Sequence, residues 1–320
     1  MTRLTPSISG IHHITAIASD PQRNLDFYAG LLGLRFVKWT VNFDDPGTYH
    51  FYYGDEAGRP GTILTFFPWP GTPRGRRGTG QATAIVFEIP PESAGFWTER
   101  LKRNGVATSA APPRMDEEAL AFQDPDGLGL ELAWTAGGTP GEGFTRGPVP
   151  GEHAIRGFRG VTLSEEGYER TSGLLVGTLG FLQVGEQGNR FRYRASGAGP
   201  GLVVDVLCLP DAPRGAVAAG TVHHVAFRAA DDAEQETWRG RLAQAGLDVT
   251  PVLDRQYFRS IYFREPGGVL FEIATDPPGF SVNEPPATLG TRLMLPPWLE
   301  PRREVLERSL PALAPPRAAA

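Results

Sequence analysis

Two pairs of adjacent histidines are the most conspicuous candidates for chemistry, because the chain has only six histidines in all. His12 and His13 lie in the segment GIHHITAI, and His223 and His224 lie in the segment TVHHVAF near the other end of the chain. Both segments are apolar and β-branched, which predicts strands. Neighbouring side chains of a strand point to opposite faces, so we expect one histidine of each pair to face a pocket and the other to support it from behind.

Glu272 is the candidate third ligand, in the apolar segment VLFEIA. An unpaired charge buried in such a strand is costly, so this carboxylate should meet a metal, another cation or a proton. Two histidines and one carboxylate on one face of a pocket suit a divalent first-row metal with open positions. This ligand set is the facial triad of non-haem Fe(II) oxygenases. A divalent first-row metal is therefore expected, and Mn(II) or Zn(II) can also occupy such a site in the purified protein.

An internal repeat could bring these distant residues together. Four units begin near residues 10, 82, 158 and 221, and each reads as a strand, an amphipathic helix and three further strands. Four βαβββ units predict an α+β fold with two curved, cup-like mixed β-sheets and helices outside, because a β-sandwich does not explain four such helices. We expect an N-terminal domain at 8–140 (units 8–70 and 80–135), a C-terminal domain at 152–278 (units 155–210 and 220–276), and a C-terminal arm with a short helix at 279–320.

The repeat also aligns the carboxylates. In each unit, one position lies four residues after the turn glycine that precedes the last strand. In units one to four, this position is occupied by Thr65, Glu131, Asp205 and Glu272, respectively. Pairing unit one with two, or three with four, leaves each cup with histidines from one unit only. Pairing unit one with unit four brings both histidine pairs together with Glu272, and it places Thr65 in the fourth position. For Glu131 and Asp205 we expect structural ion pairs with arginines or contacts with backbone amides.

The composition narrows the class of protein. The chain has 320 residues, 40% of them hydrophobic and 21% charged, with a net charge of -5, so we expect a globular protein without the basic surface that binds nucleic acid or anionic membranes. No apolar window reaches the length of a membrane span, and the N-terminus lacks the apolar stretch of a signal peptide. Cys208 is the single cysteine, so the cytoplasm is the expected location. A small-molecule substrate is expected, and a homo-oligomer is compatible with the sequence.

These features resemble the vicinal oxygen chelate (glyoxalase/bleomycin resistance/dioxygenase) superfamily. From residue 8 to about residue 312, the chain is similar to the ring-cleaving dioxygenases that open para-hydroquinones, such as 2,6-dichlorohydroquinone and methylhydroquinone 1,2-dioxygenases. The match spans all four units and the arm. The matching stretches include HHITAIASD, GNRFRYR, DRQYFRSIYFREPGGVLFE and LPPWLEPRR.

The resemblance implies that His13, His224 and Glu272 bind Fe(II), and that His12 and His223 act from behind the ligands. It also implies that units one and four share the metal cup, and that O2 is the co-substrate. Both atoms of O2 would be inserted into a para-hydroquinone.

Further residues of the predicted site surround these ligands. The resemblance implies pocket roles for Arg255 and Tyr262. An arginine there would hold a phenolate or a developing oxyanion, and a tyrosine hydroxyl can donate to a bound oxygen and pass a proton. Tyr257, His50 and Thr65 are weaker candidates for contact with the substrate.

Three other activities are compatible with the same sequence. An extradiol catechol dioxygenase would use the same metal on an ortho-diol. A glyoxalase-type isomerase or lyase would use Zn, Ni or Mn, usually with two carboxylates, whereas the predicted cup has one. An antibiotic-binding protein of this fold would need no metal, and the histidine–glutamate set argues against it.

Overall fold

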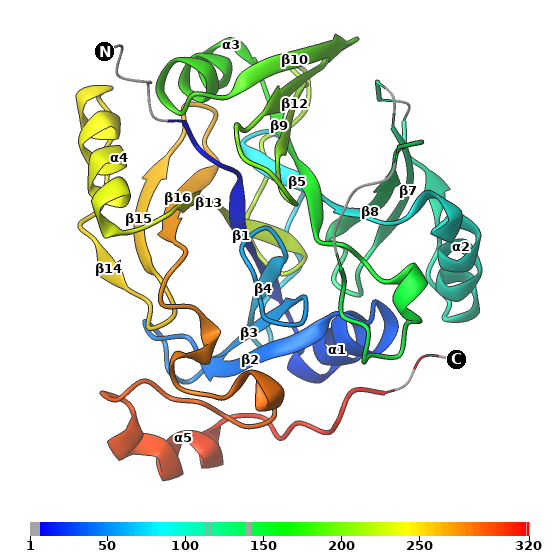
Figure 1. Cartoon of the computed structure of the whole chain (residues 1–320), viewed down its shortest axis with the longest axis vertical. Coiled ribbons are helices and arrows are strands. Elements are labelled where there is room, and N and C mark those ends of the chain that lie inside the picture. The colour runs from blue at the N-terminus through cyan, green and yellow to red at the C-terminus, as the bar shows by residue number, and fades with distance from the viewer. Residues whose placement is uncertain (1–6, 113, 116, 138–141, 318, 320) are drawn as a thin grey trace.

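Two mixed β-sheets of eight strands each form the body of the protein, and helices cover their outer sides (Figure 1). The structure is a computed structural model that describes residues 7–112, 114–115, 117–137, 142–317 and 319. The α+β fold with two curved mixed sheets agrees with the expectation from the repeat. No helix within the described residues is both long and apolar enough to cross a membrane.

The first sheet combines strands from the two ends of the chain. Its order is β14–β15–β16–β13–β1–β4–β3–β2, so the two strands that carry the histidine pairs are antiparallel neighbours at its centre. Its strands are β1 (Ile11–Ala18), β2 (Arg35–Val41), β3 (Tyr49–Gly54), β4 (Ile63–Pro68), β13 (Thr221–Ala229), β14 (Leu253–Asp254), β15 (Arg259–Arg264) and β16 (Leu270–Thr275).

The second sheet is built in the same way from the middle of the chain. Its order is β10–β11–β12–β9–β5–β8–β7–β6, with β5 and β9 as antiparallel neighbours at the centre. Its strands are β5 (Gln81–Glu88), β6 (Ser109–Ala110), β7 (Glu118–Gln123), β8 (Gly129–Trp134), β9 (Phe158–Glu165), β10 (Leu182–Gln187), β11 (Arg190–Arg194) and β12 (Val203–Cys208).

Helices follow the first strand of each unit, as the repeat predicts. The carboxylate of Asp20 accepts a hydrogen bond from the Arg23 backbone N–H and so caps the first helix. The helices are α1 (Pro21–Leu25), which continues as a π-helical segment η1 (Asp26–Leu31), α2 (Ala94–Arg103), α3 (Glu169–Ser172), which continues as η4 (Gly173–Thr178), α4 (Asp232–Gln244) and α5 (Arg303–Ser309). Short 3-10 turns are η2 (Pro91–Ser93), η3 (Gly151–His153), η5 (Phe280–Val282), η6 (Pro286–Thr288) and η7 (Glu300–Arg302).

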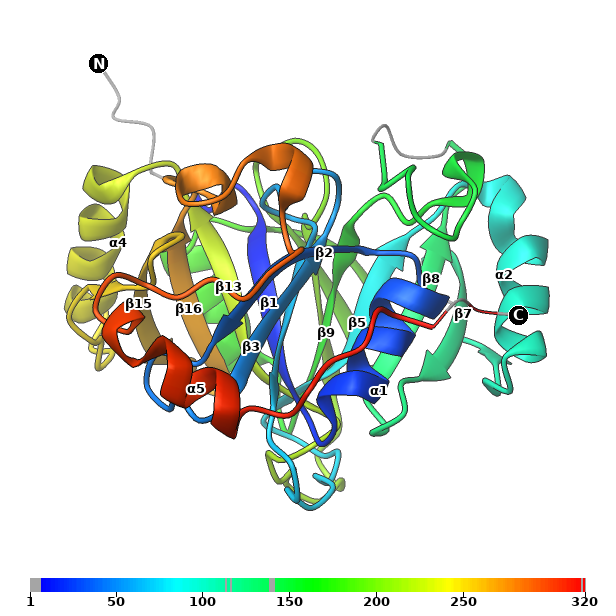
Figure 2. The same ribbon diagram turned by 90° about the horizontal axis from the view of Figure 1, so that it is seen from below.

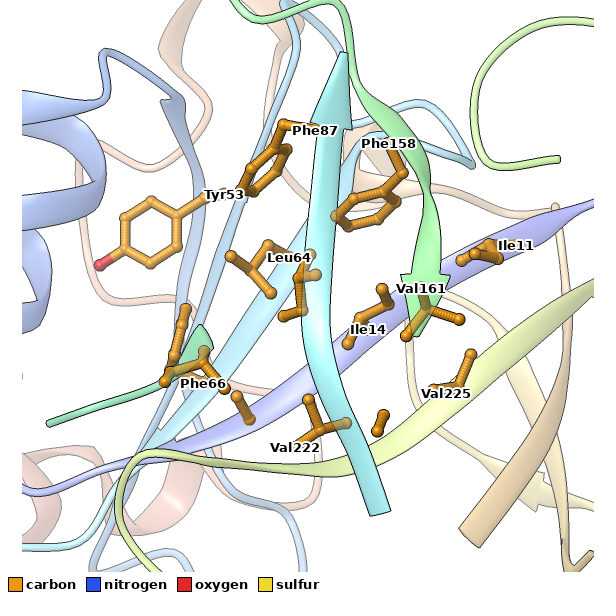
Figure 3. Packing of buried hydrophobic residues seen from close by; sticks show 14 of the residues in the cluster. Ile11, Ile14, Tyr53, Leu64, Phe66, Phe87, Phe158, Val161, Val222 and Val225 are labelled. Carbon is orange, nitrogen blue, oxygen red and sulfur yellow. The ribbon is translucent and has the colours of Figure 1, made fainter. Parts of the chain in front are cut away.

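The main hydrophobic core includes side chains from the facing central strands of both sheets (Figure 3). Ile14 of β1 and Val225 of β13 are register partners, and both are fully buried in this core. The next register partners, Thr15 and His224, therefore point to the other face of the first sheet. One face of each central strand thus serves the core, and the opposite face is available for a site.

The C-terminal arm is anchored by a buried ion pair. Lys38 of β2 and Glu284 of the arm are both fully buried, and Lys38 Nζ lies 2.6 Å from a Glu284 carboxylate oxygen. The arm then crosses the first sheet and passes α1 (Figure 2), where the Ala314 backbone N–H donates to the Gln22 side chain. The arm is therefore an integrated part of the fold.

The second sheet holds a buried network of ion pairs in place of the histidines. By register, Gly160 and Ala84 take the positions of His13 and His224. Both carboxylates of the repeat are paired with arginines, as expected for Glu131 and Asp205. Glu131 contacts Arg114 at 2.5 Å, Asp205 contacts Arg190 at 2.9 Å and Arg192 at 2.8 Å, and Glu117 contacts Arg114, Arg159 and Arg192.

Arg192→Leu should destabilise the fold by about 3–5 kcal/mol, because it leaves the buried carboxylates of Asp205 and Glu117 short of a cation. The free energy of unfolding in urea measures this loss. Arg103→Leu is the control, since the Arg103–Glu99 pair is largely exposed, and it should cost less than about 1 kcal/mol. Equal losses in the two variants would contradict a structural role for the network.

The ion pair between Arg192 and Asp205 should make the free energy of unfolding depend on pH. Although burial opposes ionisation, Arg192 and Arg190 hold the pKa of Asp205 below its ordinary value. Ionised Asp205 therefore stabilises the folded chain, and this contribution disappears as the pH falls through the lowered pKa. The difference in stability between the wild type and Arg192→Leu should shrink over that acidic range.

Candidate metal centre and its pocket

Each histidine pair sits at an irregularity in the pairing of β1 with β13. The register slips by one residue at His12 in β1 and at His223 in β13, so each of these residues is the extra residue of a β-bulge. A bulge interrupts the alternation of side chains. His13 lines the metal pocket while His12 lines a separate cavity, whereas His223 and His224 both line the pocket. The rings of each pair are nearly perpendicular, with 2.9 Å between the Nδ1 atoms of His12 and His13 and 2.8 Å between those of His223 and His224.

The bulges direct one imidazole nitrogen of each pair toward Glu272. His13 Nε2 lies 3.2 Å from His224 Nε2, and the Glu272 Oε2 atom lies 2.9 Å from His224 Nε2 and 3.5 Å from His13 Nε2. All three side chains are buried, and one ligand atom of each lies within 4.8 Å of the others. Among the described residues, no other set of three such side chains converges in this way.

This cluster fits a divalent metal ion. The buried Glu272 Oε2 has no hydrogen-bond donor besides the two imidazoles, while Ser260 Oγ donates to Oε1 at 2.5 Å. Burial opposes ionisation, but His13 and His224 hold the pKa of Glu272 well below its ordinary value. The cluster therefore offers an anionic oxygen and two imidazole nitrogens, which are suitable ligands for Fe(II), Mn(II) or Zn(II).

The supporting histidines are neutral. Burial lowers the pKa of His12 well below its ordinary value and lowers that of His223 to about 3. A neutral imidazole has one N–H, so a hydrogen bond between two Nδ1 atoms uses a proton from only one ring. When His13 and His224 supply that proton, their Nε2 atoms keep a free lone pair for the metal. This arrangement explains why each ligand is preceded by a second histidine.

The cluster lies at a pocket of about 410 Å³ between the two halves of the first sheet. Apolar walls come from Phe43, Phe67, Trp69, Phe258 and Leu270, and polar groups come mainly from His50, Tyr52, His223, Arg255 and Tyr262. This volume is in the usual range for small-molecule sites. The mixture of aromatic walls and few polar groups suits a planar aromatic ligand that carries oxygen substituents.

Arg255 links the pocket wall to its mouth. Its Nη1 atom lies 2.9 Å from an Asp44 carboxylate oxygen, and its Nε donates to the Tyr262 hydroxyl at 3.4 Å. Asp44 is 72% exposed while Arg255 is 19% exposed, so the guanidinium spans from the interior to the surface. Burial raises the pKa of Tyr262, which therefore remains a donor at neutral pH.

Two of the predicted substrate contacts lie elsewhere. Thr65 is fully buried and contacts His50 and Thr15 from behind the pocket wall. Tyr257 lines a separate cavity of about 210 Å³, which also contains His12. The left-handed backbone at Gln256, where φ is 67°, falls between Arg255, which faces the pocket, and Tyr257, which does not.

Sequence reasoning did not single out three residues that the structure brings to this region. Ser260 holds Glu272, Asp44 pairs with Arg255, and Tyr52 lines the pocket beside His50. The sequence contained a signal that could have placed Ser260 and Tyr52 near the site. Both lie on strands next to the aligned positions of the repeat, and period-two alternation places Ser260 on the face of Tyr262. Asp44 lies outside the strands and had no such signal.

Several curated relatives match nearly the whole chain. A provisionally named ring-cleaving dioxygenase, MhqO, of Bacillus subtilis (strain 168) is 49% identical over 301 residues, covering 94% of this chain and 95% of the relative. A chlorohydroquinone/hydroquinone 1,2-dioxygenase of Sphingobium indicum is 34% identical over 318 residues, covering 97% and 98% of the two chains.

Solved structures agree with the fold. A provisionally named dioxygenase of Bacillus subtilis has a TM-score of 0.94 at 47% identity, covering 98% of this chain and all of that chain. Glyoxalase I of Zea mays has a TM-score of 0.61 at 15% identity, with 83% and 92% covered, and this likeness concerns the fold alone. The family profile matches residues 10–132 and 163–273. The chain therefore belongs to the Glyoxalase/Bleomycin resistance protein/Dioxygenase superfamily.

Proposed function

We propose that this chain is a ring-cleaving dioxygenase that inserts both atoms of O2 into a para-hydroquinone. The observation that carries the proposal is the buried cluster of His13, His224 and Glu272 at an aromatic-walled pocket. The 34% identity to a chlorohydroquinone/hydroquinone 1,2-dioxygenase over nearly the whole chain supports the choice of substrate. With a single cysteine in the chain, we place the enzyme in the cytoplasm.

We propose Fe(II) as the cofactor, held by His13, His224 and Glu272. When bound, it would lower the pKa of a coordinated hydroxyl and provide a path for electrons between the aromatic ring and O2. Ser260 fixes the carboxylate through Oε1, and His12 and His223 fix the orientation of the two imidazoles. These contacts keep the ligands in place and leave one side of the cluster facing the pocket.

The pocket residues supply positioning and electrostatic stabilisation. Arg255 places a permanent positive charge beside the site of a phenolate, although it shares that charge with Asp44. Tyr262 remains protonated and can donate a hydrogen bond to a substrate oxygen or O2-derived oxygen. The aromatic walls, including Phe67 and Phe258, exclude water from the ring and hold it against the cluster.

The two alternative activities have different requirements. The glyoxalase type needs a second carboxylate in the protein, and the extradiol type needs a second hydroxyl at another position of the substrate. A glyoxalase-type site with a second carboxylate would need an acid at the fourth aligned position, where this chain has Thr65. An extradiol catechol dioxygenase would use the same cluster, and it differs only in the placement of the second hydroxyl. A preference for hydroquinones over catechols therefore distinguishes the proposed activity from that of an extradiol catechol dioxygenase.

Protein prepared without oxygen and loaded with Fe(II) should consume O2 with hydroquinones and open the ring, with both atoms of labelled O2 in the product. Catechols should be opened far more slowly. Oxygen-electrode measurements and mass spectrometry of the product test this. Opening of catechols in preference to hydroquinones would favour the extradiol reaction, and metal-dependent isomerisation without O2 uptake would favour the glyoxalase type.

Glu272→Gln should lower the affinity for Fe(II) by at least about 100-fold, because an anionic ligand becomes a neutral amide. The internal repeat offers a matched control. Glu131→Gln changes the aligned residue of the second sheet, which pairs with Arg114, and it should leave the bound metal unchanged. Metal analysis after dialysis measures both. Full iron content in Glu272→Gln would remove this residue from the ligand set.

Arg255→Met should lower kcat/KM for a hydroquinone by about 100-fold, the usual effect of removing one group that stabilises an anionic oxygen. Arg259→Met is a control four residues away, since Arg259 forms a largely exposed pair with Asp232. Steady-state kinetics should show little change in the control. A similar loss in both variants would indicate disturbance of the β14–β15 region and no specific role for Arg255.

A further inference from the structure

Four side chains form a hydrogen-bonded chain that ends at the pocket. The Tyr52 hydroxyl lies 2.9 Å from His50 Nδ1, His50 Nε2 lies 2.8 Å from Thr65 Oγ1, and Thr65 Oγ1 lies 2.9 Å from Thr15 Oγ1. Tyr52 and His50 line the pocket, whereas Thr15 and Thr65 are fully buried behind it. The chain thus connects the interior of the first sheet to the place where a substrate would bind.

The repeat gives Tyr52 a counterpart on the other side of the site. Tyr52 lies directly opposite Thr65 across β3 and β4, just as Tyr262 lies directly opposite Glu272 across β15 and β16. Thr65 and Glu272 occupy aligned positions, so Tyr52 corresponds to Tyr262. By the same alternation His50 corresponds to Ser260, and each contacts the aligned residue of its own half. The two tyrosines therefore reach the pocket from equivalent places.

The number of N–H and O–H protons in this hydrogen-bonded chain exceeds the number of its hydrogen bonds. Burial lowers the pKa of His50 well below its ordinary value, so the imidazole is neutral and carries one N–H. That proton and the three hydroxyl protons serve three contacts. Within the described part of the structure, these hydroxyls have no further hydrogen-bond partner. One proton is therefore left without an acceptor. It belongs to Tyr52 or to Thr15 when all donors run in one direction, and to Thr65 when Thr65 Oγ1 accepts from both neighbours.

The two ends differ in what can accept the remaining proton. If the donors run inward, the free O–H belongs to Thr15, which is fully buried and lacks a second acceptor among the described residues. A buried donor without a partner is destabilising, and the same penalty applies if Thr65, which is also fully buried, keeps the free O–H. If the donors run outward, the free O–H belongs to Tyr52 at the pocket, where water or a ligand oxygen can accept it. The outward direction is therefore the more stable one.

We propose that Thr15, Thr65 and His50 form a polarised hydrogen-bond chain that fixes Tyr52 as a donor to an oxygen atom of the bound aromatic substrate. This inference rests on the proposed function and adds a second phenolic donor opposite Tyr262. In this arrangement Thr15 donates to Thr65, Thr65 donates to His50 Nε2, and His50 Nδ1–H donates to the Tyr52 oxygen. Tyr52 is the catalytic residue of the chain, and the other three are positioning residues.

The tautomer of His50 tests the direction without substrate. We expect the ¹⁵N NMR signals of imidazole-labelled, Zn(II)-loaded protein to show His50 as the Nδ1–H tautomer, with the signals assigned through their loss in His50→Gln. An Nε2–H tautomer would overturn the proposal, because the donors would then run inward. This measurement needs no turnover, so it remains informative even if the proposed ring cleavage fails.

A phenolate probe tests the donor itself. Bound 4-nitrophenolate absorbs at shorter wavelength when it accepts a hydrogen bond, so its band should shift to longer wavelength in Tyr52→Phe. Thr65→Val should give part of this shift, because His50 loses its donor, and Thr65→Ser should restore the wild-type band. An unchanged band in Tyr52→Phe would contradict the proposal. Near-ultraviolet circular dichroism checks that each variant is folded.

Turnover separates this inference from the proposed function. If the wild type opens hydroquinones, Tyr52→Phe should lower kcat by about 100-fold. Thr65→Val should give a smaller loss that Thr65→Ser reverses, an effect that a purely structural role for the hydroxyl chain would not produce in kcat alone. Unchanged kcat in Tyr52→Phe would refute the catalytic role of Tyr52. Absence of hydroquinone turnover in the wild type would refute the proposed function, and the NMR and probe results would still decide the direction of the chain.

Discussion

The antiparallel pairing of β1 with β13 is the contact on which the site depends. It joins the first and last units of the repeat and places the histidine pairs beside one another. The regular ladder alone would not complete the site, because alternation would separate the members of each pair. The two bulges solve this problem by bringing each supporting ring to its ligand, at the cost of a local interruption in the sheet. The centre of the sheet is thus both the most buried and the least regular part of the cup.

The two sheets compensate the charge of their buried carboxylates in different ways. Each sheet buries carboxylates at aligned positions, and a buried charge needs compensation. In the second sheet, arginines provide it, since Glu131 meets Arg114 and Asp205 meets Arg190 and Arg192. In the first sheet, the one aligned carboxylate, Glu272, meets the imidazoles of His13 and His224, and no arginine or lysine forms an ion pair with it among the described residues. The repeat therefore yields one cup closed by ion pairs and one with a cluster suited to a cation.

The repeat made the architecture and part of the site predictable from the sequence. Some of the signals are local and do not depend on tertiary contacts. They are helix caps such as Asp20, the turn glycines before the last strands and the aligned carboxylates. The bulges were not predictable, because they depend on the pairing of two strands distant in sequence. A period-two rule placed His223 behind the pocket, whereas His223 lines it. Tyr257 was misplaced for a related reason, since the left-handed backbone at Gln256 reverses the direction of the chain. The role of Ser260 required knowledge of the β15–β16 register.

The central position of β13 has a consequence for the order in which the protein can form on the ribosome. Synthesis starts at the N-terminus, so β1 emerges long before β13 (Thr221–Ala229) and β16 (Leu270–Thr275). Until then, the edge of β1 that pairs with β13 in the finished sheet has no strand partner. The second sheet is composed entirely of residues 81–208 and can close first. It then offers β5, which packs against β13 in the finished protein, as a surface on which the last unit can dock when it is synthesised.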